Sequence, residues 1–172
     1  SENRLTGRLR EVSVREGIAT VVAPFGSYEL GADTPLRAQV GLRLPWYGPT
    51  GKVYFEPRIN ASYRFTDRWL LKAGYGANHQ FPLQVIDFNQ TNVSRAATIW
   101  TLADGEVFPV QAGRELSLGL SGSPSSWFFD LEFYRKQVAG LSATSVSFET
   151  AGFETGDSRS IGMDLLVRKR WG

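Results

Sequence analysis

The sequence contains no cysteine, a single histidine and no long apolar run. Without cysteine there is no disulfide framework, no thiolate metal site and no cysteine nucleophile. The one histidine, His79, has no partner at ligand spacing beside it, so no metal site is expected. No apolar segment approaches the roughly 18 residues of a transmembrane helix. This does not exclude a transmembrane β-barrel, because its lipid-facing residues alternate with polar ones and form no long apolar run.

The sequence also lacks an excess of either charge. Lys and Arg total 19 and Asp and Glu total 17, which gives a formal net charge of +2. This balance is too even to favour nucleic acid as a partner, and the charges are spread along the chain instead of gathered into runs. The chain opens on Ser1-Glu2-Asn3 without the basic and apolar regions of a signal peptide, so we expect a mature, trimmed or partial chain.

Motifs for catalysis are absent. Gly119-Leu120-Ser121-Gly122-Ser123 does not match the nucleophile elbow of hydrolases, and no phosphate-binding loop occurs. Asp130 and Glu132 share a face, as paired carboxylates of glycosidases do, but a polar wall with basic neighbours explains them more simply. The candidates for those neighbours are Arg58, Arg64, Lys72, Arg168 and Arg170. We therefore expect neither an enzyme nor a cofactor.

What the sequence does contain is alternation. From Phe55 to Phe65 the odd positions are apolar and the even positions are polar or charged, which puts the two sets on opposite faces of a β-strand. Glu56 belongs to the polar set, so we expect it to meet water or a polar lumen. Similar patterns and turn residues predict about eight strands. These are roughly Arg8–Arg15, Thr20–Leu30 (interrupted by Pro24), Leu36–Leu44, Tyr54–Phe65, Trp69–Gly76, Glu115–Ser121, Trp127–Lys136 and Ser160–Arg170.

The connections between the predicted strands are alternately short and long. The short ones are Gly31–Pro35, Thr66–Arg68 and Ser121–Ser126; the long ones are Trp46–Lys52, Ala77–Gly113 and Val138–Asp157. This pattern predicts an all-β, antiparallel up-and-down meander with tight turns at one end, as in outer-membrane barrels. Residues 1–172 are interpreted as one β-barrel segment with no separate linker.

Large aromatic residues fall at the predicted tight-turn ends of the strands. They are Phe65, Trp69, Trp127 and Trp171. Aromatics gathered at one height are typical of the girdle at a membrane interface. A soluble barrel would instead place the apolar set inside, but a loop as long as Ala77–Gly113 and an inward set as bulky as that of Trp127–Phe133 are unusual in a small soluble barrel.

The block Tyr54–Gly76, with Glu56-Pro57-Arg58 at its start and Asp67-Arg68-Trp69 at its turn, resembles the mid-barrel hairpin of TonB-dependent outer-membrane receptors, most closely the Bacteroidetes type. Asn78-His79-Gln80-Phe81 resembles the opening of the next extracellular loop in that family. In the segment Gly156–Lys169, Gly162 precedes an acidic residue, Asp164, as in a family strand. The resemblance covers roughly Leu36 to Trp171.

The resemblance implies a wall segment of a barrel of about 22 strands. The chain lacks the family's plug domain, its TonB box and a terminal aromatic residue, because Gly172 is last. We therefore expect an interior piece of a TonB-energised nutrient transporter in the outer membrane of a Gram-negative bacterium. Its partners would be outer-membrane lipid, the TonB complex acting through parts not present here, a surface lipoprotein, and a small-molecule, glycan or peptide substrate.

Polarity and position in the longest predicted loop select candidate ligand-binding residues, since binding residues often lie on loops held by a rigid scaffold. They are His79, Gln80, Asp87, Asn89 and Trp100. Two alternatives remain open at this point. One is a complete eight-stranded outer-membrane barrel acting as an anchor, an adhesin or a small enzyme; the other is a soluble β-barrel that binds an apolar ligand. Membrane assignment fails if Tyr63 and Leu118 face a closed protein core.

Overall fold

The computed structural model describes residues 18–31, 33–87, 97–106, 108–144 and 153–171. Every regular element in these ranges is a β-strand. The described part of the chain provides no membrane-crossing helix. The expected all-β class is confirmed. The predicted strand Arg8–Arg15 lies outside the described residues.

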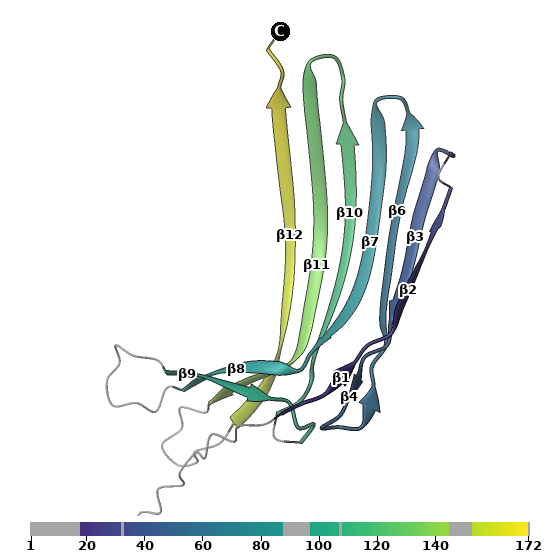
Figure 1. Cartoon of the computed structure of the whole chain (residues 1–172). Coiled ribbons are helices and arrows are strands. Elements are labelled where there is room, and N and C mark those ends of the chain that lie inside the picture. Colours follow the sequence, from purple (N-terminus) through teal and green to yellow (C-terminus); the bar gives the residue numbers. More distant parts are fainter. Residues whose placement is uncertain (1–17, 32, 88–96, 107, 145–152, 172) are drawn as a thin grey trace, which may run out of the picture.

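Seven long strands form one antiparallel meander in the order β12-β11-β10-β7-β6-β3-β2 (Figure 1). Each strand pairs with its neighbour along the wall, as an up-and-down topology requires. The strands are β2 (Phe25–Leu30), β3 (Leu36–Arg43), β6 (Glu56–Thr66), β7 (Trp69–Gln80), β10 (Gln111–Gly122), β11 (Trp127–Thr144) and β12 (Phe153–Lys169).

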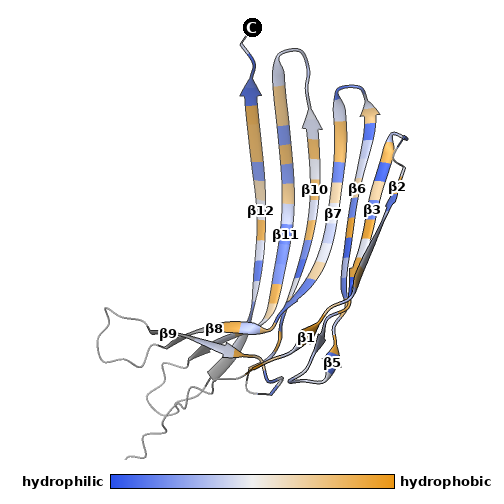
Figure 2. Ribbon diagram, in the orientation of Figure 1, coloured by the Kyte–Doolittle hydropathy of each residue, from blue (hydrophilic) through white to orange (hydrophobic). Residues whose placement is uncertain are grey.

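The cross-strand register joins the alternation of single strands into two continuous faces, because directly paired residues point to the same side of a sheet. One row of the apolar face consists of Leu36, Tyr63, Leu71, Leu120, Leu131 and Leu165. The next row consists of Ala38, Ala61, Ala73, Leu118, Phe133 and Met163. Figure 2 shows the resulting change of hydropathy from residue to residue along the strands.

The apolar face is not covered by another described element. Tyr63 is 46% exposed and Leu118 is 56% exposed, so neither faces a closed protein core. Soluble monomers rarely expose contiguous apolar patches larger than a few hundred Å². The expectation that these residues face away from a core is confirmed, and the apolar filling of a soluble ligand-binding barrel is not found on the described sheet.

The opposite, polar face is crowded at several of its glycines. A Cβ atom at Gly74 would lie 2.9 Å from Ser117 Oγ, and one at Gly119 would lie 3.0 Å from Lys72 Cε. At Gly162 the added atom would meet the ring of Tyr134. Glycine inside a strand allows such close approach and accompanies tight bending. At these three positions, side chains from neighbouring strands lie across one another on the polar face.

The tight turns lie at one end of the sheet and the elaborate connections at the other (Figure 1). We call these the turn end and the loop end. The turn end carries the predicted aromatics. Trp127 stacks on Phe129 at a centroid distance of 6.1 Å, and Lys169 Nζ lies 5.4 Å from the Trp127 ring centroid and 4.0 Å from that of Trp171.

The five short strands build a small folded cap at the loop end. The strands β1 (Val21–Val22), β4 (Trp46–Tyr47) and β5 (Lys52–Val53) form one sheet, and β8 (Pro82–Asp87) pairs with β9 (Ala97–Leu102). The buried hydrophobic residues of the described chain gather in this cap: Tyr47, Phe81, Leu83 and Ala103. The molecule thus has its compact core beside the wall and not inside it.

The extents of several predicted strands and loops are wrong. Strands β7, β10, β11 and β12 all continue further toward the loop end than predicted, so Ala77–Gly113 and Val138–Asp157 are not loops over their full length. Trp46–Lys52 contains β4 and the start of β5. Alternation is needed only where the two faces meet different solvents, so it fades where a strand runs beyond the apolar band. A register shift between Val138 and Leu141, with Gly140 at φ 78°, also breaks the period.

Pro24 separates β1 from β2, as the sequence predicts. Strand β2 is one edge of the main sheet and β12 is the other, and these two strands do not pair with each other. The described strands therefore form an open wall. A closed eight-stranded barrel has an interior that side chains just fill, whereas Arg58, Asn60 and Arg64 on the polar face are exposed. This observation favours a wider wall.

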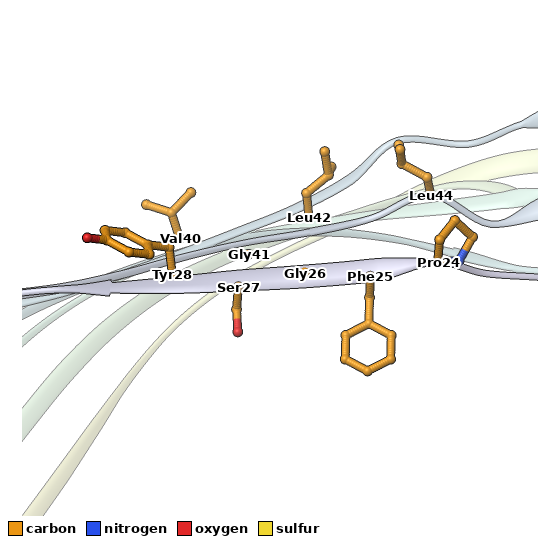
Figure 3. Close-up of a pocket in the computed structure, with 9 residues that line it drawn as sticks. All are labelled: Pro24, Phe25, Gly26, Ser27, Tyr28, Val40, Gly41, Leu42 and Leu44. Carbon is orange, nitrogen blue, oxygen red and sulfur yellow. The ribbon is translucent and has the colours of Figure 1, made fainter.

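Figure 3 shows the two faces at the edge of the wall. Tyr28, Val40 and Leu42 lie on one side of the β2–β3 pair, and Phe25 and Ser27 lie on the other. No atom lies within 4 Å of a Cβ added at Gly26, which leaves a shallow apolar hollow on the side of Tyr28. The edge strand therefore keeps Tyr28 on the apolar face, while Phe25 is an exposed apolar residue on the polar side.

Candidate ligand-binding region

The polar face carries a hydrogen-bonded ion pair that crosses three strands. Lys72 Nζ on β7 donates to Asp130 Oδ1 on β11 at 2.7 Å and to Oδ2 at 3.1 Å, passing over Gly119 of β10. Ser121 Oγ donates to the same carboxylate at 2.8 Å. The prediction that a basic neighbour on the wall accompanies Asp130 is confirmed. Both charged side chains are about one-third exposed, so water reaches the ion pair. Because exposed ion pairs add little to the stability of a fold, this pair mainly positions polar groups.

A hollow lies on the polar face beside this ion pair. Its floor includes Gly74 and Ser117, and charged side chains of both signs surround it, among them Lys72, Arg37 and Glu132. Direct register links Arg37, Lys72 and Glu132 in one row across the wall. The glycines leave room there, while the mixed charge offers both donors and acceptors. Such a surface suits transient contact with a polar solute.

Glu56 is the main departure from the predicted polar face. Its side chain is 2% exposed, although the alternation predicts contact with water or a lumen. Glu56 Oε2 accepts a hydrogen bond from Arg43 Nη1 at 2.8 Å, and Oε1 accepts one from the backbone N–H of His79 at 2.7 Å. A buried carboxylate requires such partners. Glu56 therefore ties the loop ends of β3, β6 and β7 together, which pattern alone could not reveal because its partners come from two other strands.

His79 lies within this junction and is not an open loop residue. It belongs to β7, its side chain is 18% exposed, and its ring is 4.8 Å from that of Tyr54. Its Nδ1 atom is 3.4 Å from Glu56 Oε1 and is buried without a hydrogen-bond partner. The expectation of a loop position is wrong because β7 extends to Gln80. The residue connects the wall to the cap.

The cap core holds a buried phenol. The hydroxyl of Tyr47 donates to the Ala103 carbonyl oxygen at 2.8 Å, and its ring stacks on Phe81 at a centroid distance of 4.3 Å. Burial raises the pKa of Tyr47 above its usual value, and Tyr54 and Asp104 add to the shift. The Ala103 amide bonds to the Phe81 carbonyl. These contacts fix the start and the end of the β8–β9 hairpin on the cap.

The other predicted ligand-binding residues fall in or beside this hairpin. Gln80 ends β7, is exposed, and donates through Nε2 to the Pro82 carbonyl at 2.9 Å. Trp100 lies on β9 and is 64% exposed, and Asp87 is the last residue of β8. Asn89 lies outside the described residues. Gln80 and Trp100 are exposed enough for direct contact with a ligand, whereas His79 is packed between the wall and the cap.

The described residues contain no group of three or more His, Cys, Asp or Glu side chains that could hold a metal ion. These regions offer groups suited to non-covalent recognition. The polar face offers charged and hydroxyl groups over a hollow, and the cap presents an exposed indole above a rigid core.

The geometry defines a class of architecture. An antiparallel meander that is apolar on one face and polar on the other, with tight turns at one end and a folded cap at the other, is the wall of a wide β-barrel.

Comparison with solved structures gives the same answer for the fold. The crystal structure of the siderophore receptor PirA from Pseudomonas aeruginosa is similar to this chain with a TM-score of 0.61 at 13% identity. The match covers 87% of this chain and 30% of that of PirA, so the chain spans less than a third of the receptor's length. No protein-family model matches the sequence, and a search of curated proteins finds no match. The similarity shows the fold of a β-barrel wall; membership of the receptor family and the finer likeness to the Bacteroidetes type stay predictions.

Proposed function

We propose that this chain forms part of the barrel wall of an outer-membrane, TonB-energised receptor that takes up a nutrient. The observation that carries the proposal is the apolar face, which runs across six strands in direct register without a covering element. A face of this kind needs an apolar solvent. The opposite face, with Lys72 and Asp130, needs water or a polar lumen.

The height of the apolar band supports a membrane as that solvent. On β12 the outward positions run from Lys169, beside Trp127 and Trp171, to Arg159, ten residues away. Ten residues rise about 34 Å along a strand. A tilt of about 40° reduces this to roughly 26 Å of height, close to the ~25 Å band of an outer-membrane barrel. Charged residues thus flank an apolar stretch of bilayer thickness.

The proposed role is transport without catalysis. The wall would supply one side of the lumen, and the cap with Trp100 would contribute to the substrate entrance. The fold shared with a siderophore receptor makes small iron-carrying molecules the first substrate class to test. Energy would come from TonB, as the resemblance of the Glu56-Pro57-Arg58 block implies, through parts of the receptor outside this chain.

Uptake by the producing bacterium tests the proposal. Cells with the gene, without it, and with the gene but lacking TonB are supplied with radioiron-loaded hydroxamate and catecholate siderophores, labelled cobalamin, and labelled oligosaccharides and peptides. We expect one compound to enter only the cells that have both the gene and TonB. Recovery of the protein outside the outer-membrane fraction, or uptake of every compound independent of TonB, would contradict the proposal.

A further inference from the structure

Three arginines gather on the apolar side of the wall, just beyond the loop-end limit of the apolar band. Arg114 on β10 and Arg159 on β12 are both direct neighbours of Gln137 on β11. Arg135 precedes Gln137 by two residues and therefore points to the same side. All three arginines are exposed. The nearly balanced net charge of the chain gives no sign of this cluster, because its members come together only when β10, β11 and β12 pair.

The row next to Arg114 and Arg159, toward the turn end, is apolar apart from Arg135. Arg135 pairs directly with Leu116 and with Ile161, which are 48% and 68% exposed. Tyr75 continues the same row on β7. Arginine side chains at the border of an apolar row place their guanidinium groups at the height where a bilayer changes from acyl chains to headgroups.

The cluster has a surplus of positive charge. None of the ion pairs among the described residues involves Arg114, Arg135 or Arg159. Asp157, two residues before Arg159, is an acidic residue on the same side of β12, and its Oδ1 accepts a hydrogen bond from the Gly140 amide at 3.3 Å. Neighbouring strands are about 4.8 Å apart, so three long side chains can converge on one anion.

We propose that Arg114, Arg135 and Arg159 form a site for the phosphate headgroup of an anionic membrane lipid in the loop-side leaflet. The inference rests on the proposed membrane position of the wall. Guanidinium groups bind phosphate oxygens through paired hydrogen bonds, and their planar shape fits that geometry. The apolar row beneath them would contact the acyl chains of the same lipid. Such a lipid would fix the wall at one depth in the membrane.

Spin-labelled lipids test this site in the protein reconstituted into phosphatidylcholine. The ratio of the association constants of labelled phosphatidic acid and labelled phosphatidylcholine measures the preference for the phosphate headgroup. One arginine near a headgroup changes an affinity roughly fivefold. We expect each single change, Arg114→Gln, Arg135→Gln or Arg159→Gln, to lower the site's preference about fivefold, and the triple change to remove it.

The matched control changes three arginines of the polar face, Arg37→Gln, Arg58→Gln and Arg64→Gln, with the same loss of charge. It should keep the preference. Equal loss in the control, or an unchanged ratio in the single variants, overturns the site. Competition by inorganic phosphate at the same concentration would also overturn it, since it indicates a site for free anions. If a label at Leu118 is shielded from lipid, the membrane proposal itself fails, and the two failures are thereby distinguished.

Discussion

At the scale of single residues, Gly162 has a physical reason to be glycine. It lies opposite Tyr134 in the register of β11 and β12, and a Cβ atom at this position would meet the tyrosine ring. An aromatic side chain that covers a glycine on the neighbouring strand restores the contacts that the missing side chain would have made. The glycine before the acidic Asp164 is therefore a packing feature of the polar face.

We predict that Gly162→Ala destabilises the wall by about 1–3 kcal/mol, because the added methyl group displaces the Tyr134 ring. Gly76→Ala is the control, since Gly76 lies on the same polar face and has no atom within 4 Å of an added Cβ. Strand propensity changes in the same direction in both variants. Guanidinium unfolding followed by tryptophan fluorescence measures the difference. Equal stability of the two variants would contradict the role of Tyr134.

Tyr47 provides a pH-dependent prediction in the cap. Burial raises its pKa in the folded protein, so its contribution to stability is complete below the unfolded pKa near 10 and is lost as pH rises through the folded value. Tyr47→Phe should cost about 0.5–1.5 kcal/mol at neutral pH through loss of the bond to the Ala103 carbonyl. It should also remove this alkaline loss of stability.

Thermal unfolding at neutral and alkaline pH measures both effects. Tyr28→Phe is the control, since Tyr28 is 68% exposed on the edge strand. This variant should behave like the unmodified protein at both pH values. If Tyr47→Phe loses as much stability as the unmodified protein on going to alkaline pH, ionisation of Tyr47 is not the cause.

At the scale of elements, the junction around Glu56 joins three strands of the wall at the point where the cap begins. Arg43 contributes from β3 and His79 from β7. We predict that Glu56→Gln weakens this junction, because a charge-assisted bond worth about 1.5–3 kcal/mol becomes a neutral one. The His79 amide should then exchange with solvent roughly tenfold faster or more.

Hydrogen exchange of the His79 amide reports the opening of the junction directly, and the amides of β11 report the wall. Glu115→Gln is the control, since Glu115 is exposed on the polar face of β10. We expect faster exchange at His79 in the first variant alone, with unchanged exchange along β11. Faster exchange over the whole sheet would show instead that Glu56 stabilises the wall as a unit.

The elements also show where sequence reasoning succeeds. Alternation predicted the seven described wall strands and the three tight turns, because within the apolar band successive residues lie on faces of opposite polarity. It failed toward the loop end, where strands such as β11 continue beyond the apolar band. It missed the β8–β9 hairpin inside Ala77–Gly113 and the buried state of Glu56. Both depend on partners distant in sequence, which a period of two does not encode.

At the scale of the whole molecule, the structure has two different parts, a compact cap and an open wall. The cap has a buried core around Tyr47 and Leu83, as a soluble protein does. The wall has none among its described residues, and its apolar face must be stabilised by whatever surrounds it. This division explains why the strands of the wall could be predicted one by one while the cap could not. It also means that a measurement of what surrounds the wall decides whether the wall lies in a membrane.

The absence of cysteine makes that measurement direct, because a single introduced cysteine carries a spin label to one position. Leu118 and Ser117 are adjacent on β10 and point to opposite faces. In isolated outer membranes, we predict that a label at Leu118→Cys is accessible to oxygen, which concentrates in lipid. A label at Ser117→Cys should be accessible to a water-soluble nickel complex. Because both labels occupy the same height, depth cannot produce the difference. Equal access of the nickel complex at both positions would place water on both faces and exclude a lipid-facing wall.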